Sequence, residues 1–405
     1  MISRQSNDAG HPREDEPARV PTPDAPPQFG VSGEKAERDW PLMTRDEVER
    51  VLAGYPAIGP VARLSWHSPR PFSAAVLVTT VRGEVVFVKR HHVSIRDVEG
   101  LLEEHAFIAH LRARGVPVAD VLANREGVTA VTQAEWTYEL HGAAPGVDAY
   151  RGAMSWTPFA DVSHAYSAGR ALARLHAAAA DYPAPARAIR PLLSSFRVLS
   201  CADLSAALDR WVAAQPLLVS SLATRDWRAD IARIIAPYHA RLVPLLPALA
   251  PLWTHGDWHA SNLLWTDDAP GAQVRTVLDF GLSDKTCAVY DLALAIERNA
   301  IEWLEPSETR HVHLDHVDAL LDGYESLAPL SDDESAALVA LLPIVHTEFA
   351  LSEVAYFEGI LQSRETGDVA YDGYLIGHTR WFEQPQGQAL LALLERRARR
   401  PRETV

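Results

Sequence analysis

Residues 253–284 contain two short apolar runs, at residues 263–265 and 274–278, separated by a turn-rich segment. The residues there that favour a turn are Asp267, Asp268, Pro270 and Gly271. Apolar runs that flank such a segment predict a β-hairpin with a long loop. Asn262 precedes the first run and Asp279 follows the second, so antiparallel pairing places them on neighbouring strands about 5 Å apart.

The polar residues at this end of the hairpin suit a metal ion. Amide and carboxylate oxygens, such as those of Asn262 and Asp279, are the hard ligands that Mg²⁺ prefers. Asp257 lies on the loop that enters the same end of the hairpin and adds a second carboxylate. A base beside metal ligands suits phosphoryl transfer, which asks little covalent chemistry of the protein. The segment therefore predicts a phosphoryl-transfer site.

The ordered motif HGDWHASN, followed by LDFG, resembles the aminoglycoside phosphotransferase and choline kinase family. Taken singly, each residue fits a structural hairpin with an N-cap Asp and a turn Asn, but the joint pattern favours the family. The resemblance implies an α+β, two-lobed protein-kinase-like fold. Its N-lobe is a small antiparallel sheet with one main helix, and its C-lobe is large and mostly helical. It also implies ATP and Mg²⁺ as cofactors.

Composition excludes several classes of protein. Of 405 residues, 47% are hydrophobic, which is enough for one bilobal enzyme, and the net charge is −15. This charge argues against nucleic acid and anionic membranes as partners, since both attract clustered Lys and Arg. It is compatible with a cationic substrate, although solubility alone also explains an acidic protein. Two distant cysteines, Cys201 and Cys287, give no disulfide framework. The sequence shows neither a membrane span nor a signal peptide, and we expect a cytoplasmic protein.

The chain divides into four predicted parts. Residues 1–40 are rich in proline and charge and are predicted to be a disordered tail. Residues 41–135 are the predicted nucleotide-binding N-lobe, 136–146 the hinge, and 147–400 the helical C-lobe that contains the catalytic hairpin, 253–284. A first helix is expected to begin at Thr44, with Glu47 completing a capping box and Gly54 ending the helix.

The N-lobe pattern predicts strands at 61–66, 74–81 and 84–89, then a helix at 98–112. Lys89 shares a strand face with apolar residues, and Glu104 lies within the apolar stripe of the helix. A lysine on such a face can equally extend to water. By the resemblance, Lys89 and Glu104 form the ion pair that holds the nucleotide phosphates.

The segment between the first two strands, SWHSPRPFSAA, lacks a glycine-rich loop. This departure favours the small-molecule branch of the family, and Ser68 and Ser73 are candidate phosphate-binding donors. Further strands are expected at 116–122 and 128–131. The resemblance implies that Glu139 and Leu140 provide backbone contacts to adenine at the hinge, and an ordinary edge strand is the alternative.

The C-lobe is expected to be helical at 163–180, 203–214, 225–246, 292–303, 308–325, 332–362 and 386–399. His176 is interpreted as a packed core residue rather than a ligand. Asp291 is interpreted as an N-cap, and the resemblance also gives it a role in bracing the catalytic loop. Asp284 is a weaker candidate for a second contact to metal or water.

The predicted catalytic residues are Asp257 and His259. Asp257 is expected to orient and deprotonate the acceptor hydroxyl, contributing on the order of 10²–10⁴-fold. His259 is expected near the transferring phosphate, whereas His255 packs under the loop. The predicted metal ligands are Asn262 and Asp279.

These patterns predict an ATP-dependent kinase that phosphorylates a hydroxyl of a small molecule. A catalytically silent nucleotide-binding protein of the same fold is the alternative, and a metal-dependent phosphohydrolase is a third hypothesis. The acceptor stays open among aminoglycoside, choline or ethanolamine, homoserine, a thiosugar and other natural products. A C-terminal helix carries candidate acceptor residues, whose alternative role is to bury an aromatic face: His346, Glu353, Tyr356 and Phe357.

Overall fold

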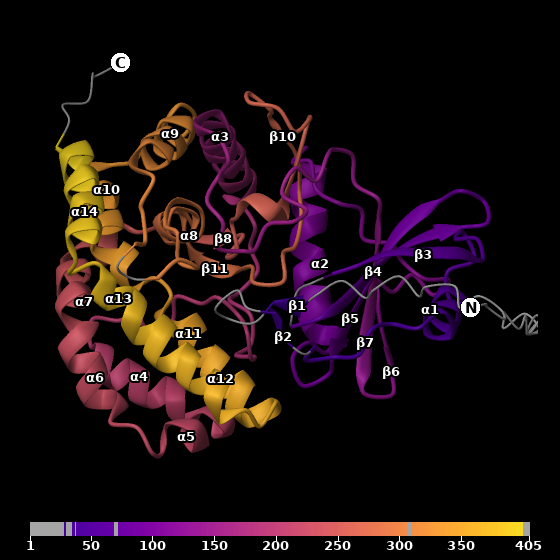
Figure 1. The fold of residues 1–405 in the computed structure, drawn as a ribbon, viewed down its shortest axis with the longest axis horizontal. Coiled ribbons are helices and arrows are strands. Elements are labelled where there is room, and N and C mark those ends of the chain that lie inside the picture. Colours follow the sequence, from indigo (N-terminus) through magenta and orange to yellow (C-terminus); the bar gives the residue numbers. More distant parts are fainter. Residues whose placement is uncertain (1–27, 30–34, 37, 69–71, 307–308, 400–405) are drawn as a thin grey trace, which may run out of the picture.

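The computed structural model describes residues 28–29, 35–36, 38–68, 72–306 and 309–399, which fold into two lobes (Figure 1). The smaller lobe is built on a five-stranded sheet with strand order β3-β4-β5-β7-β6. Helix α2 (Val98–Ala113) lies between this sheet and the larger, mostly helical lobe (Figure 1). The predicted α+β, two-lobed fold class is confirmed.

All neighbouring strands of the N-lobe sheet pair antiparallel. Their bounds are β3 (Val61–His67), β4 (Ala74–Thr80), β5 (Val85–His92), β6 (Ala130–Gln133) and β7 (Trp136–Gly142). Alternation along β5 buries Val86 and Val88 on one face and turns Phe87 and Lys89 to the other. The predicted hairpin of β4 and β5 is confirmed, and its register sets Lys89 opposite Glu139 of β7 once β7 joins the sheet.

Helix α1 (Arg45–Leu52) begins at the predicted cap. The side chain of Thr44 accepts a hydrogen bond from the backbone N–H of Glu47, and Glu47 accepts one from the backbone of Thr44 in return. Of the predicted tail, residues 28–29, 35–36 and 38–40 are described, and the rest lies outside the described residues. Strand β1 (Gln28–Phe29) pairs with β2 (Lys35–Ala36).

The strand predicted at residues 116–122 is wrong. Only isolated bridges form there, from Val118 to Val277 and from Val121 to His141. The segment instead runs extended from the sheet to the catalytic hairpin, where the carbonyl of Pro117 accepts a hydrogen bond from Val277. Its alternating apolar residues therefore serve two different elements rather than one sheet.

The larger lobe contains α3 (Val162–Ala179), α4 (Leu204–Ala213), α5 (Pro216–Leu222), α6 (Trp227–Ile234), α7 (Ala236–Leu242), α8 (Ala288–Ala300), α9 (Leu314–Glu325), α10 (Asp332–Leu341), α11 (Thr347–Val354), α12 (Arg364–Asp368), α13 (Thr379–Trp381) and α14 (Pro385–Ala398). The single helix predicted at 225–246 is wrong, because Pro237 lies in the first turn of α7 and Pro244 in the first turn of a 3₁₀ segment, Val243–Ala248. Helix α5 and the helical turns between 364 and 381 were not predicted.

One helical run, Asp332–Ile360, is long and apolar enough to cross a membrane by length and composition. However, 83% of its most apolar window is buried inside the protein. A helix that is apolar all round and covered by protein is the core of a lobe. This run includes α10 and α11, and α11 forms one wall of the cleft described below.

Helices α3 and α9 pack closely where each carries a glycine. A Cβ on Gly169 would lie 1.9 Å from the carbonyl oxygen of Leu320, and a Cβ on Gly323 would lie 2.1 Å from that of Tyr166. Both distances are far inside van der Waals contact, so glycine alone lets the two backbones meet.

We expect Gly169→Ala to lower the melting temperature, since α3 and α9 must separate to accept the methyl group. Overpacking of this kind costs about 1–3 kcal/mol. Thermal melting against Gly152→Ala is the measurement, because a Cβ at Gly152 meets no atom within 4 Å. Equal melting temperatures for the two variants would contradict the role given to the close approach.

Candidate active site

The predicted catalytic hairpin forms. Strand β9 (Leu263–Trp265) pairs antiparallel with β10 (Val274–Val277), with Leu263 opposite Val277. Beyond the paired strands, the backbone N–H of Leu278 donates to the carbonyl of Asn262 at 2.9 Å. The next residue is Asp279, so the two predicted metal ligands leave the hairpin at the same end.

The loop that carries Asp257 is held by a buried carboxylate. Asp291 accepts hydrogen bonds from the backbone N–H groups of His255 at 2.8 Å and of Gly256 at 2.9 Å, and its Oδ2 lies 3.1 Å from His176 Nε2. The predicted N-cap role of Asp291 is wrong, because α8 begins at Ala288 with Cys287 as its cap. Asp291 therefore braces the loop, and the buried His176 contacts the side chain of Asp291.

The backbone of this loop requires glycine at position 256. Gly256 has a φ of +77°, and a Cβ there would lie 2.3 Å from the carbonyl oxygen of Leu282. His255 is buried beneath the loop, where its Nδ1 accepts from the N–H of Asp257 at 3.2 Å. Its Nε2 therefore carries the proton and donates to the carbonyl of Leu278 at 2.9 Å. His255 thus ties the loop to the hairpin.

Asp257 lies among three polar side chains. Its Oδ1 is 3.3 Å from Arg298 Nη1, and its Oδ2 is 3.3 Å from His259 Nε2 and accepts from Asn262 Nδ2 at 3.1 Å. Burial by itself raises the pKa of this carboxyl, but the charges of His259 and Arg298 outweigh burial and hold the pKa well below its usual range. Asp257 is therefore ionised at neutral pH.

The two predicted metal ligands differ in their surroundings. Asn262 is buried, and its Nδ2 donates to both the backbone and the side chain of Asp257, so Oδ1 is the atom that could hold a cation. Asp279 has a half-exposed side chain and a φ of +59°. A residue other than glycine in this region costs about 1 kcal/mol. Such strain is typical of a functional position.

Lys89 is a cation that lines the cleft and pairs with two carboxylates. Its Nζ donates to Asp279 Oδ1 at 3.1 Å and lies 3.4 Å from Glu139 Oε1. Burial lowers the pKa of Lys89, but Asp279 and Glu139 outweigh burial and raise it. The predicted direct ion pair between Lys89 and Glu104 is wrong. Among the ion pairs of the described residues, Lys89 pairs with Asp279 and Glu139. Glu104 is buried nearby and adds to the same pKa shift.

Glu139 of β7 pairs with Lys89 but does not line the cleft. It is fully buried, and its carboxylate lies within hydrogen-bonding distance of three histidines. The distances are 2.9 Å to His91, 2.7 Å to His105 and 2.8 Å to His141. Burial raises the pKa of Glu139, but Lys89 and the histidines lower it well below its usual range.

The predicted backbone contacts of Glu139 and Leu140 with adenine also need correction. Both residues lie inside β7, between β5 and β6, so their backbone groups serve the sheet. The carbonyl of Leu140 accepts from the backbone N–H of Leu122 at 2.8 Å. The chain leaves the sheet only after Gly142, so residues 136–142 of the predicted hinge belong to β7.

A cavity of about 160 Å³ contains the assembled residues. Lys89, Asp257, His259, Asn262 and Asp279 all line it. Ser73 also lines it, whereas Ser68 is buried, with its backbone N–H bonded to the carbonyl of Ala75. The structure therefore brings Ser73, but not Ser68, to the cleft.

Asp284 lies away from the cleft. This fully buried residue accepts from the backbone N–H groups of Arg187 at 2.7 Å and of Lys285 at 2.8 Å. Asp284 is a structural carboxylate, and its predicted contact to metal or water is corrected accordingly. Conversely, sequence reasoning missed Arg298 of α8 and Trp156, which line the cavity. Arg298 lies seven residues, or about two helical turns, after Asp291 on α8, and this helical spacing was the available signal.

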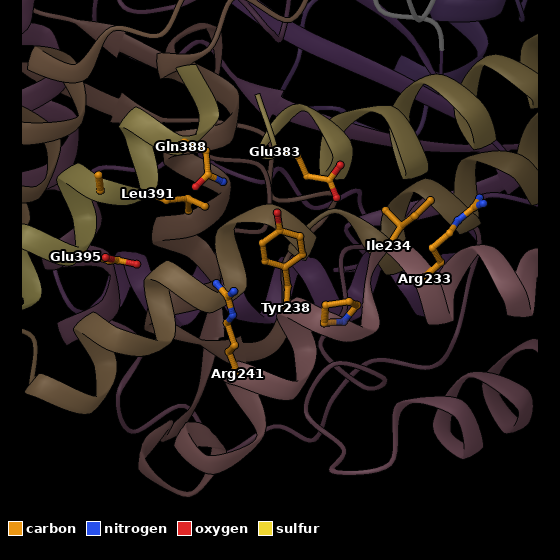
Figure 2. Close-up of a pocket in the computed structure, with 10 residues that line it drawn as sticks. Arg233, Ile234, Tyr238, Arg241, Glu383, Gln388, Leu391 and Glu395 are labelled. Carbon is orange, nitrogen blue, oxygen red and sulfur yellow. The ribbon is translucent and has the colours of Figure 1, made fainter. Parts of the chain in front are cut away.

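A separate pocket lies on the far side of the larger lobe, between α6–α7 and α14. Figure 2 shows Arg233, Tyr238 and Arg241 on one side of it and Glu383 and Glu395 on the other. It shares no lining residue with the cleft. The predicted catalytic residues Asp257 and His259 line the cleft, and neither lines this pocket.

The model of the phosphotransferase enzyme family matches residues 70–330, which is more than half of the chain. The chain belongs to this family. It is an ATP-dependent small-molecule kinase. The matched range of the kinase includes Lys89, Asp257, Asn262 and Asp279, whereas α11 lies beyond it.

Similar proteins include two that are named homoserine kinase. The protein from Rhodospirillum rubrum is 27% identical over 322 residues, which cover 77% of the kinase and 86% of the relative. The protein from Granulibacter bethesdensis is 28% identical over 295 residues, which cover 69% and 76%. A solved structure of amicoumacin kinase hAmiN, in complex with AMP-PNP, Ca²⁺ and Ami, has a TM-score of 0.54 at 12% identity. It covers 82% of the kinase and 94% of that chain, and it supports the fold alone.

Proposed function

We propose that the cleft binds ATP with Mg²⁺ and transfers the terminal phosphoryl group to a hydroxyl of a small molecule. The observation that carries this proposal is that Lys89, Asp257, Asn262 and Asp279, from both lobes, line one cavity. Lys89 offers a positive charge to phosphate oxygens, and Asn262 Oδ1 with the Asp279 carboxylate fits a hard divalent ion. When bound, Mg²⁺ neutralises charge on the phosphates.

In the proposed step, the acceptor hydroxyl lies against Asp257. The hydroxyl oxygen bonds to the terminal phosphorus, the bond from that phosphorus to the bridging oxygen breaks, and ADP leaves with that oxygen. The hydroxyl proton passes to Asp257, whose lowered pKa suits late acceptance and a mainly positioning role. His259 lies 3.3 Å from Asp257 and lines the same cavity, which supports its assignment beside the transferring phosphate.

We further propose that the acceptor is a small alcohol that carries an amine, and that the kinase acts in the cytoplasm, where ATP is supplied. Glu353 of α11 lines the cavity together with Trp156 and Phe349, an acidic and aromatic surface that favours an ammonium group. Homoserine is the first candidate because two relatives carry that name.

The experiment is ADP release by the purified kinase with ATP and Mg²⁺, measured against a panel of hydroxyl compounds. Release that depends on an acceptor supports the proposal. ADP release without any acceptor would favour phosphohydrolase chemistry, and nucleotide binding without release would favour a silent nucleotide-binding protein.

We expect Lys89→Ala to raise the KM for ATP and lower turnover, because the variant loses the charge that faces the phosphates. Glu104→Ala should weaken both less, since Lys89 keeps Asp279 and Glu139 as partners. Nucleotide titration and steady-state rates measure both variants. Unchanged affinity and turnover in Lys89→Ala would refute the assignment.

A further inference from the structure

Arg298 is a buried guanidinium that packs against two aromatic rings. It lies on α8 with 4% of its surface exposed. Its central carbon is 4.2 Å from the ring centroid of Trp156 and 5.6 Å from that of Phe349. The guanidinium is planar, so its N–H groups are directed outward in one plane. The side chain lines the same cavity as Asp257.

Two of its nitrogens have no hydrogen-bond acceptor among the described residues. These are Nε and Nη2 of Arg298. The nearest carboxylate to Nε is Glu297 Oε2, which at 3.8 Å is beyond hydrogen-bonding distance. A buried donor without an acceptor is costly, more so when it is charged. Two N–H groups in a rigid fork match the two oxygens of a carboxylate.

The two oxygens of Asp257 show on which side of the reaction Arg298 lies. Oδ2 faces Asn262, the proposed metal ligand, whereas Oδ1 faces Arg298. A base that accepts the hydroxyl proton lies between the phosphate and the acceptor. Arg298 therefore contacts the Asp257 oxygen that does not face Asn262, and we assign this oxygen to the acceptor side.

Glu353 supplies the opposite charge on the same side. It lies on α11, is 6% exposed and lines the cleft. It also lines an adjoining cavity, which shares Trp156 with the cleft and contains Trp303 and Tyr374. Burial raises the pKa of Glu353 to about 8, against the opposing charge of Arg298. An incoming ammonium favours its ionised form.

We propose that Arg298 and Glu353 form a head-group site for a hydroxylated amino acid, in which Arg298 binds the carboxylate and Glu353 the ammonium of the phosphate acceptor. This inference rests on the proposed function and narrows its acceptor from any amine-bearing alcohol to one that carries both charges. Carboxylate-free alcohols leave the Arg298 donors unpaired and are rejected for that reason.

The experiment compares acceptors that differ only in the carboxylate. The pairs are homoserine with 3-aminopropan-1-ol and serine with ethanolamine, and choline and kanamycin complete the panel. The wild-type kinase is expected to favour the carboxylated member of at least one pair by on the order of 10²–10⁴-fold in kcat/KM. This comparison needs no variant.

Variants then test which residues cause the preference for the carboxylated acceptor. Arg298→Met should abolish this preference by raising the KM for the carboxylated member, whereas the loss of its charge beside Asp257 should lower kcat with both members of a pair alike. Glu353→Gln should raise the KM for both members, because both carry the amine. Arg228→Met is the matched control, since Arg228 is exposed on α6, paired with Asp209, outside the cleft.

Each contrary outcome has a distinct meaning. A wild-type kinase that phosphorylates only carboxylate-free alcohols overturns the head-group site and leaves the proposed function standing. Equal losses with both members in Arg298→Met overturn it too, because Arg298 then acts only on Asp257 or on the phosphates. If no alcohol supports ADP release, the proposed function and the head-group site fail together.

Discussion

Asp257→Asn should lower kcat on the order of 10²–10⁴-fold while the melting temperature and the affinity for ATP stay near wild type. Asn has the same size and still accepts from Asn262, but it has no charge to draw the hydroxyl proton. The neighbours of Asp257 hold its pKa low, so the lost contribution is orientation together with late proton acceptance. The measurement is ADP release at saturating substrates, with thermal melting and nucleotide titration beside it.

Asp291→Asn is the matched control, because Asp291 is a buried carboxylate that supports the same loop. It accepts two backbone hydrogen bonds at 2.8 and 2.9 Å, and bonds to a charged group are worth about 1.5–3 kcal/mol each. We expect this variant to melt at a lower temperature, with activity falling in step. Normal turnover in Asp257→Asn, or a loss that merely follows unfolding as in Asp291→Asn, would remove Asp257 from the chemistry.

Asp279→Ala should lower kcat/KM by at least about 10²–10³-fold, a loss that added Mg²⁺ does not restore. The variant lacks the carboxylate that we propose for the metal, while Glu139 keeps Lys89 paired. Mg²⁺ titration of the rate is the measurement. Asp279→Gly should be as inactive as Asp279→Ala. It should be more stable than Asp279→Ala by about 1 kcal/mol, because glycine adopts a φ of +59° without strain.

Asp268→Ala provides the comparison for Asp279, since Asp268 is exposed at the opposite, loop end of the same hairpin. Its Mg²⁺ dependence should match wild type. A near wild-type rate for Asp279→Ala at ordinary Mg²⁺ would mean that the metal binds elsewhere.

The parts of the site that were predictable from sequence are contiguous in the chain. The hairpin register that sets Leu263 opposite Val277 follows from two apolar runs and a turn, so the positions of Asn262 and Asp279 followed as well. The capping box at Thr44 is equally local. Local patterns carry this information because each needs only a few neighbouring residues.

The rest depends on contacts between distant segments. Lys89 lies near Glu104, but the sheet register sets it opposite Glu139, and that choice is made by strands about fifty residues apart. Arg298 reaches Asp257 from another element and packs near the rings of Trp156 and Phe349. No periodicity within one segment records which distant side chains will meet.

The ion pair between Lys89 and Asp279 has a consequence for the order of ligand addition. In the structure, the charge of one side chain cancels that of the other across 3.1 Å. A divalent ion that arrives alone meets a carboxylate whose charge Lys89 already neutralises. A nucleotide that arrives alone must draw Lys89 away from Asp279, which leaves the charge of Asp279 without a partner. A metal–nucleotide complex would give each side chain a new partner at the same time. Phosphate would pair with the ammonium of Lys89, and the metal would bind the carboxylate of Asp279. Entry is therefore expected as a concerted exchange of partners, with metal and nucleotide arriving together.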